Sequence, residues 1–327
     1  MSTTRNPLAI GAITLSVLAI ASTASAQSVE IENFIGTVDI REGATLSIDG
    51  DARGTAELRG SRLRVDGGES VKGLSCNTKR NGDVMIGKGW RSKSAKSLTR
   101  DYPTLSISAP ASTAIVIRDS IVFGEVRNVG EVEASLPSCG KLVFGDVAGG
   151  FSVGLSGSAD VDAGSVGEAD LRTSGSGDFE VVNADSLSFK SSGSGDLVMR
   201  AVSGPASVST SGSGDAVIAS VGGGLNFRST GSGDIVVGHV DGPVEISTTG
   251  SGDVEIDRGE VTTLSVRTTG SGDVSIEGSV GDAEISSTGS GDVDIREQTG
   301  RLSARASGSG DVTVNGRRGK SDTLTFD

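Results

Sequence analysis

The sequence is poor in aromatic side chains, histidine and cysteine. Aromatic residues make up 3% of the 327 positions, and a single histidine, His239, accompanies two cysteines, Cys76 and Cys139. His239 stands beside a turn with no serine or cysteine motif around it, so we expect a surface histidine rather than a catalytic base. Two cysteines alone are too few ligands for a zinc site. These scarcities give no support to a hydrolytic or zinc-dependent active site.

Long apolar runs are missing after the first 26 residues. Residues 1–26 combine Arg5, a short apolar run at 8–21 and the small residues Ala24-Ser25-Ala26, which is the layout of a secretory signal peptide. The apolar run is shorter than the roughly 20 residues of a comfortable membrane span, and an uncleaved anchor is the alternative. We therefore expect an exported protein, periplasmic or extracellular and associated with the cell envelope, that is not an integral membrane protein.

Export has a consequence for the two cysteines. An oxidising compartment would allow Cys76 and Cys139 to form a disulfide. The sequence does not show whether their Cα atoms come within bonding range, so a disulfide and two free thiols are both compatible with it.

Positively charged residues are in the minority, with 29 Lys and Arg against 42 Asp and Glu and a net charge of −13. Such an acidic protein is a poor partner for nucleic acid and for anionic membranes, which both attract clustered Lys and Arg. The exception is the basic segment 72–100, which contains Trp90. Its charges follow no helical or strand spacing, which favours a solvated loop with one aromatic anchor over a patch for an acidic partner.

Glycine is abundant, with 50 residues, and much of it belongs to a repeated tetrapeptide. A degenerate copy, Gly157-Ser158-Ala159-Asp160, precedes the complete ones. A fixed period of this kind indicates a repeat architecture. The motif Gly-Ser-Gly-Asp recurs at intervals of 18 to 20 residues, at positions 175–178, 193–196, 212–215, 231–234, 250–253, 270–273, 289–292 and 308–311.

Apolar residues recur at fixed positions between the tetrapeptides. In one repeat, Val254 and Ile256 follow the aspartate, Val261 stands alone, and Leu264 and Val266 alternate with polar residues before the next glycine. Period-2 alternation is typical of strands with one face inward. Three short strands per repeat predict one turn of a parallel β-helix, because a single turn cannot bury its few apolar side chains without stacking on the next.

The predicted fold is all-β: a right-handed, single-stranded parallel β-helix, or β-solenoid, with coils of about 19 residues. A propeller is disfavoured because each blade needs about 40 residues, and a leucine-rich repeat would show a consensus that is missing here. The segment 138–141 is expected to take the place of the tetrapeptide in an early coil. The expected organisation is a signal peptide at 1–26, an N-terminal β region at 27–118 that starts or caps the solenoid, regular coils at 119–314, and a C-terminal cap or tail at 315–327.

The tandem Ser/Thr-Gly-Ser-Gly-Asp-Val array resembles the auto-transporter adhesin, head GIN domain family. The likeness is strongest over residues 174–314, and segments 34–40 and 102–110 add to it. The resemblance implies an exported bacterial parallel β-helix with an adhesin-like role, and it brings no catalytic residues with it.

The aspartates are the one feature of the repeat whose side chains could bind an ion or take part in chemistry. Stacked coils would place them in a row with neighbours about 4.8 Å apart, where like charges repel. The favoured interpretation is that each Asp caps its own turn, because Asp accepts hydrogen bonds from nearby N–H groups and glycine allows positive φ. The alternative is calcium, which binds carboxylate oxygens, although one Asp per coil supplies few ligands. The candidate calcium ligands, which we call the Asp column, are Asp160, Asp178, Asp196, Asp215, Asp234, Asp253, Asp273, Asp292 and Asp311.

The regular spacing of the repeats leaves no long insertions that could wall an active-site cleft. We expect a protein that is not an enzyme and has no cofactor, with calcium at the Asp column as the alternative. The leading hypothesis is an adhesin-like protein whose β face presents rows of Ser, Thr, Asp and Arg to a cell-surface polysaccharide or an envelope protein. The other hypothesis is a structural envelope or spacer protein without a discrete ligand site. The inward positions of Phe179, Phe189 and Phe227 weaken the sugar-binding hypothesis, because they leave no stacking platform.

Overall fold

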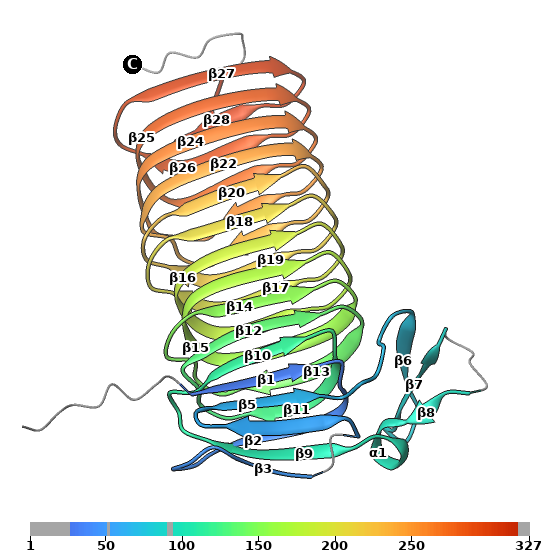
Figure 1. Ribbon diagram of the computed structural model, residues 1–327. Coiled ribbons are helices and arrows are strands. Elements are labelled where there is room, and N and C mark those ends of the chain that lie inside the picture. The colour runs from blue at the N-terminus through green and yellow to red at the C-terminus, as the bar shows by residue number, and fades with distance from the viewer. Residues whose placement is uncertain (1–26, 51–52, 90–93, 320–327) are drawn as a thin grey trace, which may run out of the picture.

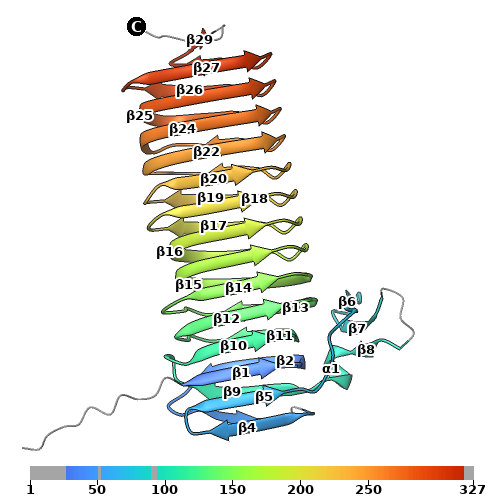
Figure 2. The same cartoon turned by 45° about the horizontal axis from the view of Figure 1, so that its top comes forward.

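The protein is a long β-solenoid, seen in a computed structural model that describes residues 27–50, 53–89 and 94–319 (Figure 1). The chain winds through about 11 turns of about 19 residues. From residue 114 onward each turn lies on the one before it, as Figure 2 shows from a second direction. At the N-terminal end, the turn of residues 28–42 lies between the strands 62–66 and 104–109 on one side and the turn of residues 114–126 on the other. The predicted all-β solenoid is thus confirmed. The predicted signal peptide, residues 1–26, lies outside the described residues, as do residues 320–327 of the predicted C-terminal cap.

Two stacks of parallel strands form the long faces of the solenoid. Face A consists of the strands that follow the tetrapeptide position in each coil, and face B of the strands that precede it. From the N-terminal end, face A contains β9 (Thr104–Ala109), β2 (Ile35–Glu42), β11 (Ile121–Val126), β13 (Cys139–Phe144), the first parts of β15 (Ser158–Thr173) and β16 (Phe179–Ser191), β17 (Leu197–Val202), β19 (Ala216–Val221), β21 (Ile235–Val237), β23 (Val254–Ile256), the first part of β25 (Val274–Gly289), β26 (Val293–Gln298) and β28 (Val312–Val314). Face B contains β5 (Arg62–Asp66), β1 (Ser28–Glu32), β10 (Ala114–Arg118), β12 (Glu131–Leu136), β14 (Phe151–Leu155), the second parts of β15 and β16, β18 (Ala206–Thr210), β20 (Leu225–Ser229), β22 (Gly242–Gly250), β24 (Glu260–Gly270), the second part of β25, and β27 (Leu302–Gly308).

The core is one continuous column of apolar side chains between the two faces. Phe189, Val208 and Phe227 occupy the same position of face B in successive coils, and each is at most 1% exposed. Phe179 of face A meets Phe189 edge to face, with ring centroids 6.2 Å apart. Each coil contributes only a few such residues, so its stability comes from burial against the coils on both sides.

Antiparallel strands cover strand edges at both ends of the solenoid. At the N-terminal end, β3 (Ser47–Asp49) pairs with β9, and β4 (Thr55–Arg59) pairs with β5. At the other end, β29 (Arg317–Gly319) pairs with β28. The outer edge of β27 has no strand partner among the described residues. Reversed strands at an end interrupt the parallel stacking and so limit pairing with further chains.

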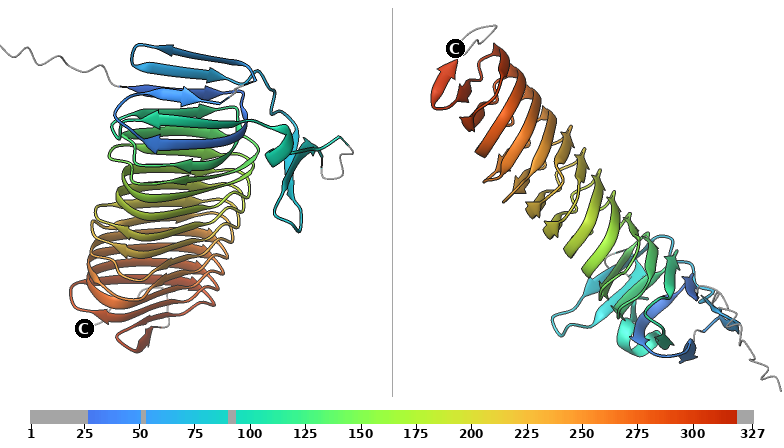
Figure 3. Two further views of the ribbon diagram at one scale, coloured as in Figure 1. Left: turned by 90° about the horizontal axis from the view of Figure 1, so that it is seen from below. Right: turned by 90° about the vertical axis from the view of Figure 1, so that its left-hand side faces the viewer.

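A small excursion, which we call the flap, leaves the side of the N-terminal coils (Figure 3). The prediction of a solvated loop over residues 72–100 is wrong for most of this segment, because apolar residues such as Ile86 fold it against the solenoid. Trp90 lies outside the described residues. The flap is an antiparallel three-stranded sheet followed by one helical turn: β6 (Leu74–Thr78), β7 (Val84–Lys88), β8 (Lys96–Ser97) and α1 (Leu98–Asp101).

Close stacking of the coils, more than turn conformation, explains the glycines of the tetrapeptide. A Cβ atom at Gly212 would lie 1.8 Å from the carbonyl oxygen of Gly193 in the preceding coil. The positive φ expected at these glycines occurs only at the first glycine of the last three tetrapeptides, Gly270, Gly289 and Gly308. In the earlier tetrapeptides, glycine is needed because only a hydrogen atom fits between adjacent backbones.

Candidate functional site

The Asp column forms a ladder of hydrogen bonds along the corner where face B turns into face A. Asp178 Oδ1 accepts a hydrogen bond from the backbone N–H of Asp196, one coil later, at 2.9 Å. The same bond recurs in every step from Asp160 to Asp311, at 2.7 to 3.3 Å. The expectation that each Asp caps its own turn is therefore corrected: each carboxylate from Asp160 to Asp292 caps the turn of the following coil.

The two ends of the Asp column meet cations. Lys141 occupies the Asp position in the coil before Asp160, and the guanidinium of Arg318 pairs with Asp311. The hydrogen bond and ion pair with Asp162 are the main cause that raises the pKa of Lys141, and Asp160 adds to it. In the part of the chain that the structure describes, no three His, Cys, Asp or Glu side chains form a group that could hold a metal ion. The observed contacts of the column are those of a capping ladder, and calcium binding stays a hypothesis.

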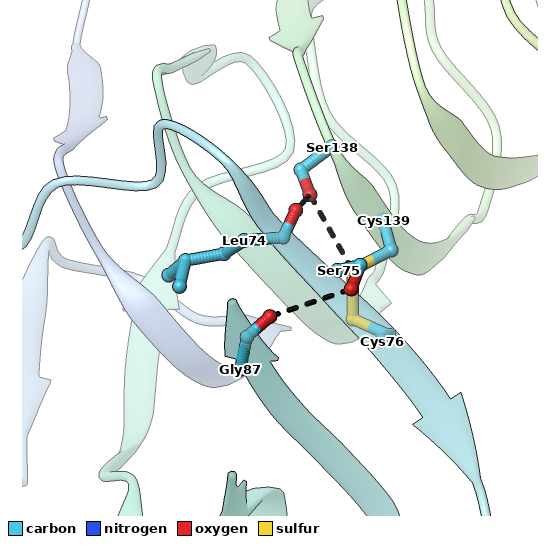
Figure 4. The surroundings of a disulfide bond; sticks show 6 residues. All are labelled: Leu74, Ser75, Cys76, Gly87, Ser138 and Cys139. Carbon is cyan, nitrogen blue, oxygen red and sulfur yellow. Dashed lines mark hydrogen bonds between the residues drawn. A yellow bond between two sulfur atoms is a disulfide. The ribbon is translucent and has the colours of Figure 1, made fainter. Parts of the chain in front are cut away.

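The two cysteines form a disulfide that fastens the flap to the solenoid (Figure 4). Cys76 lies on β6 and Cys139 begins β13, so the bridge joins segments 63 residues apart in the sequence. Beside it, the Ser138 hydroxyl donates a hydrogen bond to the carbonyl oxygen of Leu74 at 2.6 Å. Cys139 stands at the position of the tetrapeptide serine, since it pairs in register with Ser158. The expected alignment of this segment with the tetrapeptide is thus confirmed.

A cavity of about 960 Å³ lies where the flap overhangs the first tetrapeptide corners. Residues 70–75 at the base of the flap form one wall, and residues 157–158 and 175–176 form another. Asp66 and Asp119 also border it. The cavity lies between the part of the corner that the flap covers and the part that is open to solvent.

A second hollow, which we call the axial groove, runs along face B through eight coils and has a volume of about 1030 Å³. Coils about 4.8 Å apart make such a groove roughly 34 Å long. Its floor is a row of small and apolar side chains: Ala169, Leu187, Ala206, Leu225, Val244, Leu264, Ala283 and Leu302. One rim, which we call the polar rim, carries carboxylates, hydroxyls and an amide: Asp170, Ser188, Ser207, Asn226, Glu245, Ser265, Glu284 and Ser303.

His239 is partly exposed, and its Nε2 lies 3.0 Å from Asp241 Oδ2 in a hydrogen bond. This bond is the main cause that lowers the pKa of Asp241, and a backbone N–H donated by Glu260 of the next coil lowers it further. Asp241 thus caps a neighbouring coil in the manner of the Asp column. These contacts give His239 a structural partner at the surface and no nucleophile.

A comparison with known protein families finds a match for the later coils. Residues 201–319 match the family described as "Putative auto-transporter adhesin, head GIN domain". This match makes the later coils, residues 201–319, similar to a head GIN domain. No curated protein and no solved structure matches the chain. The adhesin-like family and the solenoid together fit a non-enzymatic surface protein. Among the described residues, no helix is both long enough and apolar enough to cross a membrane.

The axial groove is the feature that the sequence pattern did not reveal. The floor of the groove belongs to the inward row that the apolar pattern locates, whereas the polar rim and the turn residues before the strands do not stand out from that pattern. The inner rim of the groove includes Pro205, Gly224 and Pro243, which stand near the start of the face B strands in three successive coils. Aligning the repeats column by column would have shown this cluster of turn residues ahead of the strands.

Proposed function

We propose that this protein is an exported, adhesin-like protein without catalytic activity that binds an extended surface polysaccharide along the axial groove. The observation that carries the proposal is the continuity of the groove, which crosses eight successive coils. A linear polymer can contact equivalent side chains in every coil, whereas a small ligand would use a fraction of that length. The family match supports the adhesin-like part of the proposal.

The chemistry of the groove suits a sugar chain. Serine hydroxyls such as Ser207 and Ser265 on the polar rim can both donate and accept hydrogen bonds. The side chains of Asn226 and Glu245 hold each other on the rim at 2.7 Å. The residues that line the groove include no aromatic side chain, so binding would rest on many weak contacts repeated from coil to coil. Repetition of weak contacts along one chain raises the overall affinity without any single strong contact.

The test is a binding screen with groove-filling variants. The wild-type protein is compared with S207Y/S265Y, which fills the groove, and with A219Y/S275Y, which adds the same bulk to outward positions of face A. The targets are whole cells and isolated cell-surface polysaccharides. We expect the groove variant to lose at least about tenfold in affinity, whereas the face A variant binds as the wild type does.

Two results would contradict the proposal. Saturable binding that survives in S207Y/S265Y would exclude the groove as the binding site. A wild-type protein that binds no tested surface would favour the structural or spacer protein.

We propose a stacking role for the Asp column in preference to calcium binding. One oxygen of each carboxylate up to Asp292 already accepts a backbone N–H from the next coil. We expect the melting temperature to be the same with added calcium and with chelator. A rise of several degrees in calcium that D253N/D273N diminishes would instead show a cation site.

A further inference from the structure

A column of basic side chains runs beside the axial groove on face B. It occupies the outward position two residues after the polar rim on each strand. From Arg228 onward the register alternates: Arg228 pairs with Ser247, Ser247 with Arg267, Arg267 with Ser286, and Ser286 with Arg305. Every second coil therefore presents a guanidinium, with a hydroxyl between. The members of this basic column are Arg172, Lys190, Arg228, Arg267 and Arg305.

Most of these cations are available to a partner. Among the described residues, Lys190 and Arg305 have no ion-pair partner, and Arg267 donates to a hydroxyl of the polar rim at 3.1 Å. Arg172 and Arg228 pair with carboxylates of the polar rim on an exposed surface. Exposed ion pairs contribute little free energy, so a ligand carboxylate can replace those of the rim.

The basic column differs from the molecule around it. The protein has a net charge of −13, and the polar rim beside the column carries the carboxylates Asp170, Glu245 and Glu284. The attraction for an anionic partner is therefore confined to the basic column itself. The outward column of face A two residues after each Asp carries no basic side chain along the same coils: Asp162, Glu180, Val198, Val217, Val236, Glu255, Ser275, Asp294 and Thr313.

The surface is hollowed at the N-terminal end of the basic column. Arg172 and Lys190 line a pocket of about 480 Å³ together with hydroxyls that include Ser174 and Ser192. Thr173 lines the same pocket, is 3% exposed, and has a buried hydroxyl without a hydrogen-bond partner in the described structure. Because this hydroxyl is buried, the groups that the pocket offers to a ligand are the two cations and the serine hydroxyls.

Resting on the proposed function, we infer that face B recognises a linear acidic polysaccharide with one carboxylate per disaccharide. Coils about 4.8 Å apart place Arg228, Arg267 and Arg305 at successive intervals of about 9.6 Å. Two pyranose rings of an extended chain span about the same distance. A carboxylate on every second sugar would meet one guanidinium each time, in the bidentate geometry that arginine favours. The intervening serines face the uncharged sugars, and the polysaccharide follows the axial groove.

The test compares polymers that differ in the spacing of their charges. The probes are hyaluronan, with a carboxylate on every second sugar, polygalacturonate, with one on every sugar, neutral dextran, and single-stranded DNA. The variant R228S/R267S/R305S extends the serine of the intervening coils to every coil from residue 209 to residue 305. The control R200S/R258S/R296S removes the same charge from exposed arginines outside face B. We expect the wild type to prefer hyaluronan, the column variant to lose about tenfold in hyaluronan affinity, and the control to keep it.

Each other outcome overturns the inference. Equal wild-type affinity for hyaluronan, polygalacturonate and DNA would show charge attraction without recognition of spacing. An equal loss in both triple variants would show a general electrostatic effect. Hyaluronan or dextran binding that the column variant leaves intact but S207Y/S265Y abolishes would keep the groove as the polymer site and remove the basic column from it. No binding of any probe by the wild type would exclude this class of ligand, while the screen of cell-surface polysaccharides decides the proposed function separately.

Discussion

The corner between face B and face A exists in two versions, one covered by the flap and one open to solvent. In the N-terminal coils, Ile35, Ile121 and Cys139 stand at the position of the tetrapeptide serine and pack with flap residues such as Ile86. From Ser158 onward the same position holds serine, which needs no cover. The tetrapeptide thus forms a corner that needs no covering segment, because its serine faces water and its aspartate caps the next coil.

The two versions also differ in what holds them together. The covered corner depends on one disulfide and on a small apolar cluster between segments far apart in the sequence. The open corner depends on close backbone stacking and on hydrogen bonds that recur between adjacent coils. We therefore expect damage to the covered corner to stay local and damage to the open corner to weaken the stack of coils.

Removal of the disulfide should have the largest effect on this comparison. The bridge spans a sequence separation of 63 residues, for which chain entropy alone predicts a stabilisation of about 4 kcal/mol. We expect C76S/C139S to accelerate amide hydrogen exchange across β6 and β7, while exchange in the later coils is unchanged. Wild-type protection of β6 and β7 in this variant would mean that the apolar cluster alone holds the flap.

A methyl group on a tetrapeptide glycine should have the next largest effect. Gly212→Ala pushes a Cβ against the carbonyl oxygen of Gly193, and we expect this overpacking to cost about 3 kcal/mol of unfolding free energy. The matched change in the flap, Gly82→Ala, meets no atom within 4 Å and has only its φ of 83° to accommodate, at a cost of about 1 kcal/mol. Urea unfolding measures both. Equal costs would show that coil stacking is not what requires glycine.

Changes in the Asp column should have a smaller effect. Asp253 Oδ1 accepts the N–H of Asp273 at 2.8 Å. We expect Asp253→Ala to lower the unfolding free energy by about 1 kcal/mol, because that N–H loses its acceptor. Asp253→Asn keeps an oxygen in place and relieves like-charge repulsion, so its stability should stay within about 0.5 kcal/mol of the wild type. If Asn destabilises as much as Ala does, the charge and not the acceptor is what matters.

The pH dependence should give the smallest difference between the flap and the later coils. The pKa of Asp83 in the flap is lowered mainly by a hydrogen bond from the Ser97 hydroxyl, and the pKa of Asp282 mainly by Arg301. A carboxyl whose folded pKa is lowered stabilises the fold above its ordinary pKa, and this contribution is lost as the pH falls below about 4 toward the folded value.

Added salt distinguishes the two causes of the lowered pKa values, the hydroxyl hydrogen bond at Asp83 and the ion pair at Asp282. We expect roughly 1 M salt to raise the pKa of Asp282 toward its ordinary value, because the ions screen its pair with Arg301. The pKa of Asp83 should move less, since a neutral hydroxyl donor is its main partner. Nuclear magnetic resonance titration of the carboxyl carbons measures both, and equal shifts would contradict the assignment.

The repeat fold could be predicted from the sequence because its signal is redundant. Residues such as Phe189 and Phe227 recur at a fixed offset, so each coil supports the assignment of the next. The alignment of residues 138–141 with the tetrapeptide followed from the same offsets. The Asp column was located correctly, but its hydrogen bonds were assigned to the wrong coil. An aspartate side chain can reach N–H groups of its own turn or of the next, and only the stacking distance decides between them.

The flap and the axial groove could not be predicted in this way. The flap is held by single pairings such as Cys76 with Cys139, for which no repeat supplies a second example. Its strands alternate apolar and polar residues too briefly to stand out from a basic loop. The basic column and the polar rim of the groove are assembled from outward side chains of different coils, and these rows appear only when the register between coils is known.

The alternation of Arg228, Ser247 and Arg267 constrains how the gene for this protein could gain coils by duplication. Duplication of one coil of about 19 residues would be acceptable to the backbone, but it would place two arginines or two serines side by side and put the rest of the row out of phase. Duplication of two coils together would preserve both the fold and the phase. Selection for a longer binding surface of this kind would therefore retain insertions of even numbers of coils.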